Sequence, residues 1–157
     1  MQYTNRVKFV FPSYSKNEGF ARGAAALFAA SLDPTVEEIS DIKAAVSEAV
    51  TNCIVHAYPD SIGNIEMELR TAEKKSVSEV LPANILYIKI RDRGVGISDI
   101  EQAMTPMYTS RPDDDRAGLG FAVMESFTDG VKVVSSPGKG TTVALTKRIK
   151  TAKRYVI

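Results

Sequence analysis

The sequence predicts an α+β fold in a single domain. Two segments in the first third of the chain have helical periodicity, and most of the remainder alternates apolar and polar residues as strands do. The chain has 157 residues, of which 44% are hydrophobic and 25% charged. That length allows a sizeable core, and the composition is ordinary for a soluble globular protein. We therefore expect residues 1–157 to form one domain.

The chain begins with a strand and a helix. Residues 7–11 are mostly apolar and are followed by Pro12, a pattern typical of an edge strand. Apolar residues then recur at helical spacing from Asn17 to about Leu32, where Asp33–Pro34 interrupts the pattern. The sequence thus predicts a first helix over residues 17–32.

A second helix is expected from a capping box. Thr35 stands at the N-cap position and Glu38 three residues later, so each side chain can bond the backbone N–H of the other. The helical period continues to about Ala57, and residues 58–60, Tyr-Pro-Asp, stop it. The predicted helix is about 20 residues long and includes the first motif described below.

Strand patterns dominate the rest of the chain, in residues 65–69, 85–91, 131–136 and 142–147. In residues 65–69, apolar side chains alternate with glutamates, which predicts one packed face and one wetter face. The polar segment 71–84 is expected to be a long hairpin loop without a function of its own. Residues 137–140, Pro-Gly-Lys-Gly, predict a turn between the last two strands.

Composition argues against several classes of protein. The formal net charge of +1 gives no case for direct binding to nucleic acid or membrane, and no apolar run approaches the roughly 20 residues that span a bilayer. One cysteine excludes an internal disulfide framework and favours a reducing, cytoplasmic location. The C-terminal segment contains five basic residues, Lys147, Arg148, Lys150, Lys153 and Arg154. It is interpreted as a solvated chain end; a nucleic-acid patch is the alternative, without an aromatic platform to support it.

The first chemical motif is Glu48-Ala-Val-Thr-Asn52 in the second predicted helix. A spacing of four places Glu48 and Asn52 within about 40° of each other on the helix, away from its apolar stripe. A carboxylate and an amide oxygen suit Mg²⁺ beside phosphates, and a carboxylate can accept a hydroxyl proton. The alternative is a solvated helix flank. His56 follows on the same side and is expected to cap or pack, and Cys53 falls on the buried stripe as core filler.

The second motif, Asp92-Arg-Gly94-Val-Gly96, follows a strand. An aspartate there can accept a hydrogen bond from an exocyclic amine, which distinguishes adenine from guanine. Gly94 and Gly96 are expected to allow positive φ angles and close approach to a flat base. Taken alone, the motif also fits a simple turn.

The third motif, Arg116-Ala-Gly118-Leu-Gly120, resembles a glycine-rich helix start, where backbone N–H groups and the helix dipole favour phosphate. It lacks the Gly-Lys-Ser/Thr of a P-loop. Arg116 can neutralise a terminal phosphate. The polar segment 104–115 before it is interpreted as a lid over nucleotide or, alternatively, as a surface loop. Three such motifs in this order predict a nucleotide site.

These residues resemble the GHKL ATPase superfamily and, within it, the anti-sigma serine kinases. The likeness covers nearly the whole chain, and it rests on residues 47–52, 54–58, 91–97, 109–112, 118–121 and 140–142. Residues 17–22 and 32–35 extend it to the sporulation branch of that family. The family's paired threonines stand here as Thr109-Ser110, and the connection 71–84 is longer than usual.

The resemblance implies a two-layer α/β sandwich: a mixed, mostly antiparallel sheet covered on one face by helices, with ATP or ADP and Mg²⁺ bound between them. It also implies a homodimer that holds a sigma factor inactive. Such a protein phosphorylates a serine of a small anti-anti-sigma protein.

The resemblance also implies roles for single residues. Glu48 would be the catalytic base, Asn52 the Mg²⁺ ligand and Asp92 the partner of the adenine amine. Further nucleotide contacts would come from Gly94, Gly96, Thr109, Arg116, Gly118, Leu119, Gly120 and Thr141. Arg22 would lie on the partner-binding surface.

Other functions remain open on the sequence. A kinase of a stress-response sigma system would share the same chemistry. A non-enzymatic module, in which nucleotide only stabilises a sigma-binding surface, would not need the carboxylate of Glu48. A detached histidine-kinase catalytic domain is disfavoured, because no phosphoacceptor helix precedes the motifs and His56 is the only histidine.

Overall fold

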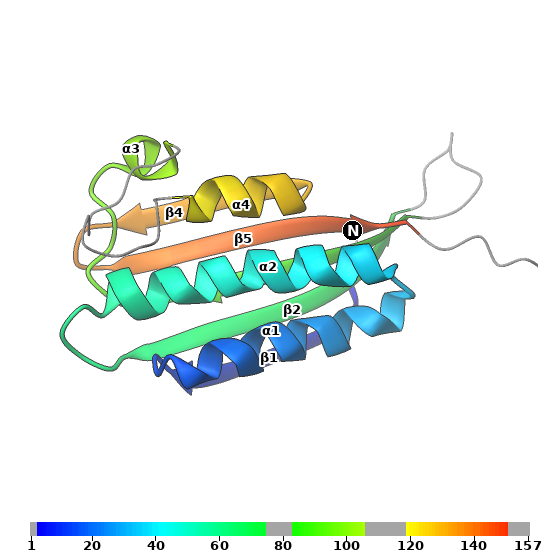
Figure 1. The fold of residues 1–157 in the computed structure, drawn as a ribbon, viewed down its shortest axis with the longest axis horizontal. Coiled ribbons are helices and arrows are strands. Elements are labelled where there is room, and N and C mark those ends of the chain that lie inside the picture. Colours follow the sequence, from blue (N-terminus) through cyan, green and yellow to red (C-terminus); the bar gives the residue numbers. More distant parts are fainter. Residues whose placement is uncertain (1–2, 75–82, 106–118, 151–157) are drawn as a thin grey trace, which may run out of the picture.

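The computed structural model describes residues 3–74, 83–105 and 119–150. The described residues form five strands, four α-helices and two short helical segments of other types (Figure 1). In chain order these are β1 (Tyr3–Pro12), α1 (Lys16–Ala29), η1 (Ala30–Leu32), α2 (Val36–Asn52), η2 (Cys53–Ala57), β2 (Asn64–Lys74), β3 (Ala83–Arg91), α3 (Ile100–Met104), α4 (Gly120–Phe127), β4 (Gly130–Ser136) and β5 (Gly140–Ile149). The expected α+β class is confirmed.

The five strands form one sheet in the order β1-β2-β3-β5-β4, with β1 at an edge as Pro12 predicted. All four pairings between the described strands are antiparallel, so the sheet differs from the mixed sheet that the resemblance implied. The reason lies in the last strand. The chain returns through α4 so that β4 runs in the same direction as β3, but β5 is inserted between them.

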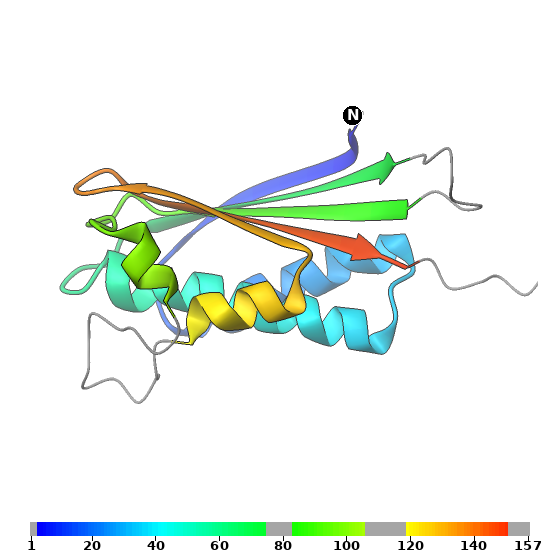
Figure 2. The ribbon, with the colours of Figure 1, turned by 90° about the horizontal axis from the view of Figure 1, so that it is seen from above.

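The helices and the sheet form two layers. Helices α1, α2 and α4 lie on one face of the sheet, and none of the described helices covers the other face (Figure 2). Helix α2 lies between α1 and α4 and contacts both. The largest fully buried side chains fill the space between the layers: Ile42, Val46, Val50, Ile65, Met67, Leu69, Leu86, Ile88, Ile90, Met124, Leu145 and Ile149. No helix in the described part of the chain is long and apolar enough to cross a lipid bilayer.

Strand β2 shows the predicted alternation, with one departure. Its apolar side chains are buried against the helices, but Glu68, on the other face, is also only 4% exposed. The side chains of Arg6 and Arg70 both donate to Glu68 Oε1 and cover it. Burial alone would raise the pKa of Glu68, but the bonds from Arg70 and Arg6 hold that pKa below its ordinary value of 4.5.

Strands β2 and β3 extend into the segment expected to be a loop. Thr71 pairs with Leu86 and Ala72 pairs with Ile85, and all four side chains are buried. Residues 71–74 and 83–84 therefore belong to the sheet, which the polar composition of the segment obscured.

The predicted starts of the first two helices are confirmed, and the end of the second helix is corrected. In the capping box, Glu38 N–H donates to Thr35 Oγ1 at 3.1 Å and Thr35 N–H donates to Glu38 Oε2 at 2.9 Å. The first predicted helix is α1 followed by the short 3₁₀ turn η1, which ends where Asp33 takes a positive φ of 55°. The second is α-helical only to Asn52, and η2 continues it as a π-helix with a wider turn.

Candidate functional site

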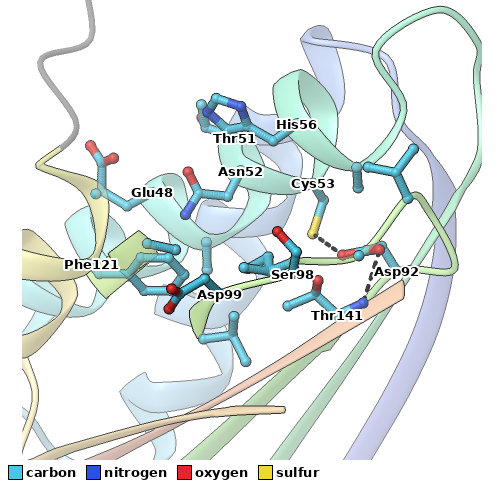
Figure 3. Close-up of a pocket in the computed structure, with 18 of the residues that line it drawn as sticks. Glu48, Thr51, Asn52, Cys53, His56, Asp92, Ser98, Asp99, Phe121 and Thr141 are labelled. Carbon is cyan, nitrogen blue, oxygen red and sulfur yellow. Dashed lines mark hydrogen bonds between the residues drawn. The ribbon is translucent and has the colours of Figure 1, made fainter. Parts of the chain in front are cut away.

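Helix α2 presents Glu48 and Asn52 on the same side, one turn apart. The opposite side of the helix carries Val46 and Val50, which are fully buried in the core. Glu48 and Asn52 are half-buried and line one cavity, and Figure 3 shows both projecting from α2 toward it. The core thus fixes the direction in which an acid and an amide face.

The start of α4 lies directly against these two side chains. A methyl group added to Gly120 would come within 3.1 Å of Glu48 Oε2 and 3.3 Å of Asn52 Oδ1, so the start of α4 approaches both side chains closely. Leu119 and Phe121, on either side, line the same cavity. The first N–H groups of a helix have no partner within that helix and favour an anion. The first and third motifs therefore meet at one end of the cavity.

The π-helix η2 joins this end to the loop after β3. Ala57 O accepts a hydrogen bond from Val95 N–H at 3.0 Å. The Tyr58 hydroxyl accepts from Arg93 N–H and donates to the carbonyl of Asn64, both at 2.8 Å. These bonds fix the loop that follows Asp92 against the end of the helix that carries Glu48 and Asn52.

Asp92 is 3% exposed and forms the other end of the cavity. Its Oδ1 accepts hydrogen bonds from Gly94 N–H at 2.9 Å and from Thr141 N–H at 3.1 Å. Its Oδ2 accepts from the Cys53 thiol at 3.5 Å. Asp92 N–H donates in turn to Thr141 O at 2.9 Å. The backbone of Thr141, on β5, therefore binds both the main chain and the carboxylate of Asp92.

Cys53 does more than the expected core filler. It is buried, as predicted, but its thiol lines the cavity and donates to Asp92 (Figure 3). Burial raises the pKa of the Cys53 thiol well above its ordinary value of 9.0, and the negative charge of Asp92 raises it further. The thiol is therefore a protonated donor at neutral pH.

The two glycines of the second motif serve different purposes. Gly96 has a φ of +75°, as expected, and a side chain there would also meet the carbonyl of Ser136. Gly94 does not have a positive φ, contrary to the sequence prediction. It is required because a Cβ would lie 2.1 Å from Ala57 O, at the place where the loop docks on η2.

Described residues of all three motifs thus line one cavity of about 290 Å³. Figure 3 shows Glu48 and Asn52 toward one end and Asp92 with Thr141 at the other. The wall between them combines apolar and polar groups. The full lining consists of Glu48, Ala49, Thr51, Asn52, Cys53, His56, Ala57, Asp92, Val95, Gly96, Ile97, Ser98, Asp99, Ala103, Leu119, Gly120, Phe121, Thr141 and Val143.

The donor set at the Glu48 end fits Mg²⁺ in one specific way. Within the described ranges, no cluster of three His, Cys, Asp or Glu side chains could hold a metal by itself. Mg²⁺ commonly takes only one or two protein oxygens and completes its shell with water and substrate phosphates. Asn52 Oδ1, with Glu48 beside it, fits that pattern and would hold Mg²⁺ only together with a phosphate ligand.

Several predicted positions fall outside the described residues. These are Thr109, Arg116, Gly118, most of the expected lid and the end of the basic tail. Leu119, Gly120 and Thr141 are described and line the cavity, and His56 also reaches it. Arg22 lies elsewhere, on α1, where it is exposed and pairs with Glu18 at 3.6 Å.

Sequence reasoning missed some residues of the cavity wall. Ser98 and Asp99 line it from the loop before α3. Ser135 stands behind the wall and bonds the Thr141 hydroxyl at 2.8 Å. None belongs to a motif with fixed spacing, and only the contact between elements reveals them.

Comparison with known proteins identifies the family. Residues 15–147 match the histidine kinase-like ATPase domain family. Over 153 residues the chain is 50% identical to the anti-sigma F factor of Thermoanaerobacter sp. (strain X514), an alignment that covers 98% of this chain and 100% of that protein. The chain belongs to the anti-sigma F factor family.

Two further comparisons support that assignment and the fold. The anti-sigma F factor of Clostridium acetobutylicum is 47% identical over 144 residues, covering 92% of this chain and 94% of that protein. Among solved structures, the RsbU and RsbW domains of a Mycobacterium tuberculosis protein align with a TM-score of 0.60 and 19% sequence identity. That alignment covers 98% of this chain and 35% of the longer one, and it shows a shared fold for this anti-sigma F family member.

Proposed function

We propose that the protein is an anti-sigma factor and an ATP-dependent protein-serine kinase. It binds and inhibits a sporulation sigma factor in the cytoplasm, and it phosphorylates a serine of a small anti-anti-sigma protein. One observation carries the proposal: Glu48 and Asn52 meet the start of α4 at one end of the cavity whose other end is Asp92. Relatives about half identical over nearly the full length are named anti-sigma F factors.

The Asp92 end is proposed to hold adenine. Asp92 Oδ1 is occupied by two backbone N–H groups, so Oδ2 is the atom that can accept from an exocyclic amine. Val95, Ile97 and Val143 line the same cavity and give a base an apolar contact surface. Gly96 keeps the loop free of a side chain.

The Glu48 end is proposed to carry out phosphoryl transfer. Mg²⁺ bound with the phosphates would neutralise their charge, and Asn52 is its protein ligand. Glu48 accepts the proton of the substrate serine hydroxyl while the serine oxygen forms a bond to the γ-phosphorus. The bond from that phosphorus to the bridging oxygen breaks, and ADP leaves. The N–H groups at the start of α4 stabilise the phosphate charge.

The partner surface is proposed to include α1. Arg22 is exposed on this helix, close in sequence to Phe20 and Leu27, which are 58% and 79% exposed. An exposed arginine and large exposed apolar side chains on one helix are common constituents of a binding surface. We also propose a homodimer, as the family resemblance implies; sedimentation of the purified protein tests it.

The kinase proposal is tested with labelled ATP and candidate anti-anti-sigma proteins, scoring phosphoserine. Wild type should transfer phosphate. Glu48→Gln should keep ATP affinity within about tenfold, because the amide fills the same space, but it should lose nearly all transfer. Transfer at the wild-type rate in Glu48→Gln would favour the non-enzymatic module or a different base.

The partner surface is tested with Arg22→Ala. Sigma-factor binding should weaken, while nucleotide binding stays as in wild type, because Arg22 lies outside the cavity. Pull-down and calorimetry measure the two properties separately. Lys43→Ala, an exposed cation on α2, serves as the matched control. Equal capture of the sigma factor by wild type and Arg22→Ala would remove Arg22 from the interface.

A further inference from the structure

A hydroxyl behind the cavity wall contacts three groups at the Asp92 end. Ser135, on β4, does not line the cavity. Its Oγ accepts a hydrogen bond from Ile97 N–H at 2.8 Å and lies 3.0 Å from Gly140 O and 2.8 Å from Thr141 Oγ1. One side chain therefore ties the loop after β3 to the start of β5.

Counting protons assigns the direction of each bond. A serine hydroxyl has one proton and two lone pairs. The Gly140 carbonyl can only accept, so the proton of Ser135 is used there. The Ser135 hydroxyl then has no proton left for Thr141 Oγ1, which lies 2.8 Å away. The hydrogen bond between these two oxygens is therefore donated by the Thr141 hydroxyl and accepted by Ser135 Oγ. Ser135 is thereby fully used: it donates once and accepts from Ile97 N–H and from Thr141.

The consequence falls on Thr141, which does line the cavity. With its only proton directed at Ser135, Thr141 Oγ1 can offer the cavity only lone pairs. Asp92 is in the same position, because Oδ1 accepts from two backbone N–H groups and Oδ2, which accepts from the Cys53 thiol, has no proton to give. Two neighbouring acceptors thus face a ligand at this end.

We propose that Ser135 is a positioning residue for the choice of nucleobase. By holding the Thr141 proton, it makes this end of the cavity accept only, so that a purine with an exocyclic amine is favoured over one with a carbonyl. A carbonyl oxygen placed there would face two sets of lone pairs and lose its hydrogen bonds to water without replacement. This inference rests on the proposed nucleotide site.

The first test compares the affinities of ATP and inosine triphosphate, whose base has a carbonyl in place of the amine. In Ser135→Ala, the Thr141 hydroxyl is free to turn its proton into the cavity and donate to that carbonyl. The preference for ATP should fall about tenfold. Ser135→Thr keeps the hydroxyl and should keep the preference. Ser126→Ala, which removes a hydroxyl that bonds Ala122 O on α4, is the matched control.

The second test uses Thr141→Val, which removes the hydroxyl and preserves the shape. If the hydroxyl only accepts, its loss removes an attraction for the amine and a repulsion for the carbonyl, so the preference for ATP falls. If it donates, the preference rises. Because Ser135 acts through Thr141, adding Ser135→Ala to Thr141→Val should change the preference less than about twofold.

The outcomes separate this inference from the proposed function. The role of Ser135 is overturned if wild type prefers ATP but Ser135→Ala keeps the same preference. It is also overturned if Thr141→Val has a raised preference for ATP. In both cases the proposed function stands. A wild type that binds neither nucleotide overturns the proposed function and this inference together. The expected falls in both single variants, with no further fall in the double variant, support the inference.

Discussion

The thiol of Cys53 is a buried donor to Asp92 at one end of the cavity. It is buried among core residues and bonds the carboxylate of Asp92 at 3.5 Å. Burial, and then the negative charge of Asp92, raise the pKa of Cys53 well above 9.0. The folded protein thus holds the thiol proton more tightly than the unfolded chain does.

This difference predicts a pH dependence of stability. Below about pH 9 both the folded and the unfolded chain keep the thiol proton, so the stability does not depend on the titration of Cys53 there. Above it, the unfolded chain releases the proton and the folded chain does not, so stability falls by up to about 1.4 kcal/mol per pH unit. Urea unfolding at a series of pH values should show wild type losing stability relative to Cys53→Ala above about pH 9. A difference between the two proteins that stays constant would contradict the raised pKa.

Sequence reasoning found those residues whose signal is local. Glu48 and Asn52 are fixed by a spacing of four on one helix, and Asp92 by its place between a strand and two glycines. The bonds that complete the site have no such signal: Cys53 and Asp92 are 39 positions apart, and Ser135 meets Ile97 from another strand. These contacts depend on how the elements pack, which no short pattern contains.

Among the elements, α2 has the clearest beginning. Thr35 and Glu38 satisfy each other's backbone N–H groups, and Glu38 Oε1 also accepts from Lys150 N–H at 2.9 Å. The cap thus fixes the start of the helix and the end of β5 at once. Its signature is local, which is why the sequence predicted it correctly.

Removing the cap of α2 is expected to lower the stability of the protein measurably. Thr35→Ala removes the acceptor for Glu38 N–H and should lower the free energy of unfolding by about 1 kcal/mol. Thr35→Ser keeps an acceptor at the same place and should stay close to wild type. Chemical denaturation of the three proteins measures the difference, and equal stabilities would mean that the helix start does not depend on this side chain.

The end of the same helix was not predictable from its pattern. Apolar residues continue through Cys53 and Ala57, and the spacing of buried residues does not distinguish an α-turn from a single π-turn. Two hydrogen bonds tie this wider turn to its surroundings: Val95 N–H donates to Ala57 O, and Arg93 N–H donates to the Tyr58 hydroxyl. The π-turn exists where the helix meets the loop of the candidate site.

At the scale of the whole molecule, nucleotide binding should couple to folding. The cavity is built from α2, the loop after β3, α4 and β5, so a ligand that bridges them stabilises the folded state. At a concentration of Mg·ATP one hundred times its Kd, the expected gain is about 2.7 kcal/mol. Thermal unfolding with and without Mg·ATP should show this gain in wild type, with a much smaller one in Asp92→Asn. An equal gain in Asp92→Asn would contradict the proposed role of Asp92 in binding adenine.

The overall architecture was predictable only in part. Hydrophobic periodicity gave α1, α2 and the strands, a glycine motif gave the start of α4, and α3 was not predicted. The family resemblance gave two layers with helices on one face. None of these gave the position of β5 between β3 and β4, because strand order depends on long-range pairings such as Ile88 with Leu145. The pairings of β5 with β3 and with β4 are antiparallel, so the described sheet is antiparallel where a mixed sheet was expected.

The interior position of β5 has a consequence for the newborn polypeptide. A ribosome releases β1 to β3 and the helices before Thr141, yet Thr141 supplies the backbone groups that hold Asp92. Until β5 pairs with β3 and β4, Asp92 lacks its hydrogen bonds with Thr141, and Thr141 and Val143 are absent from the cavity lining. A chain still under translation therefore lacks the Thr141 groups that hold Asp92, and the proposed base-binding end of the cavity is complete only once β5 has joined the sheet.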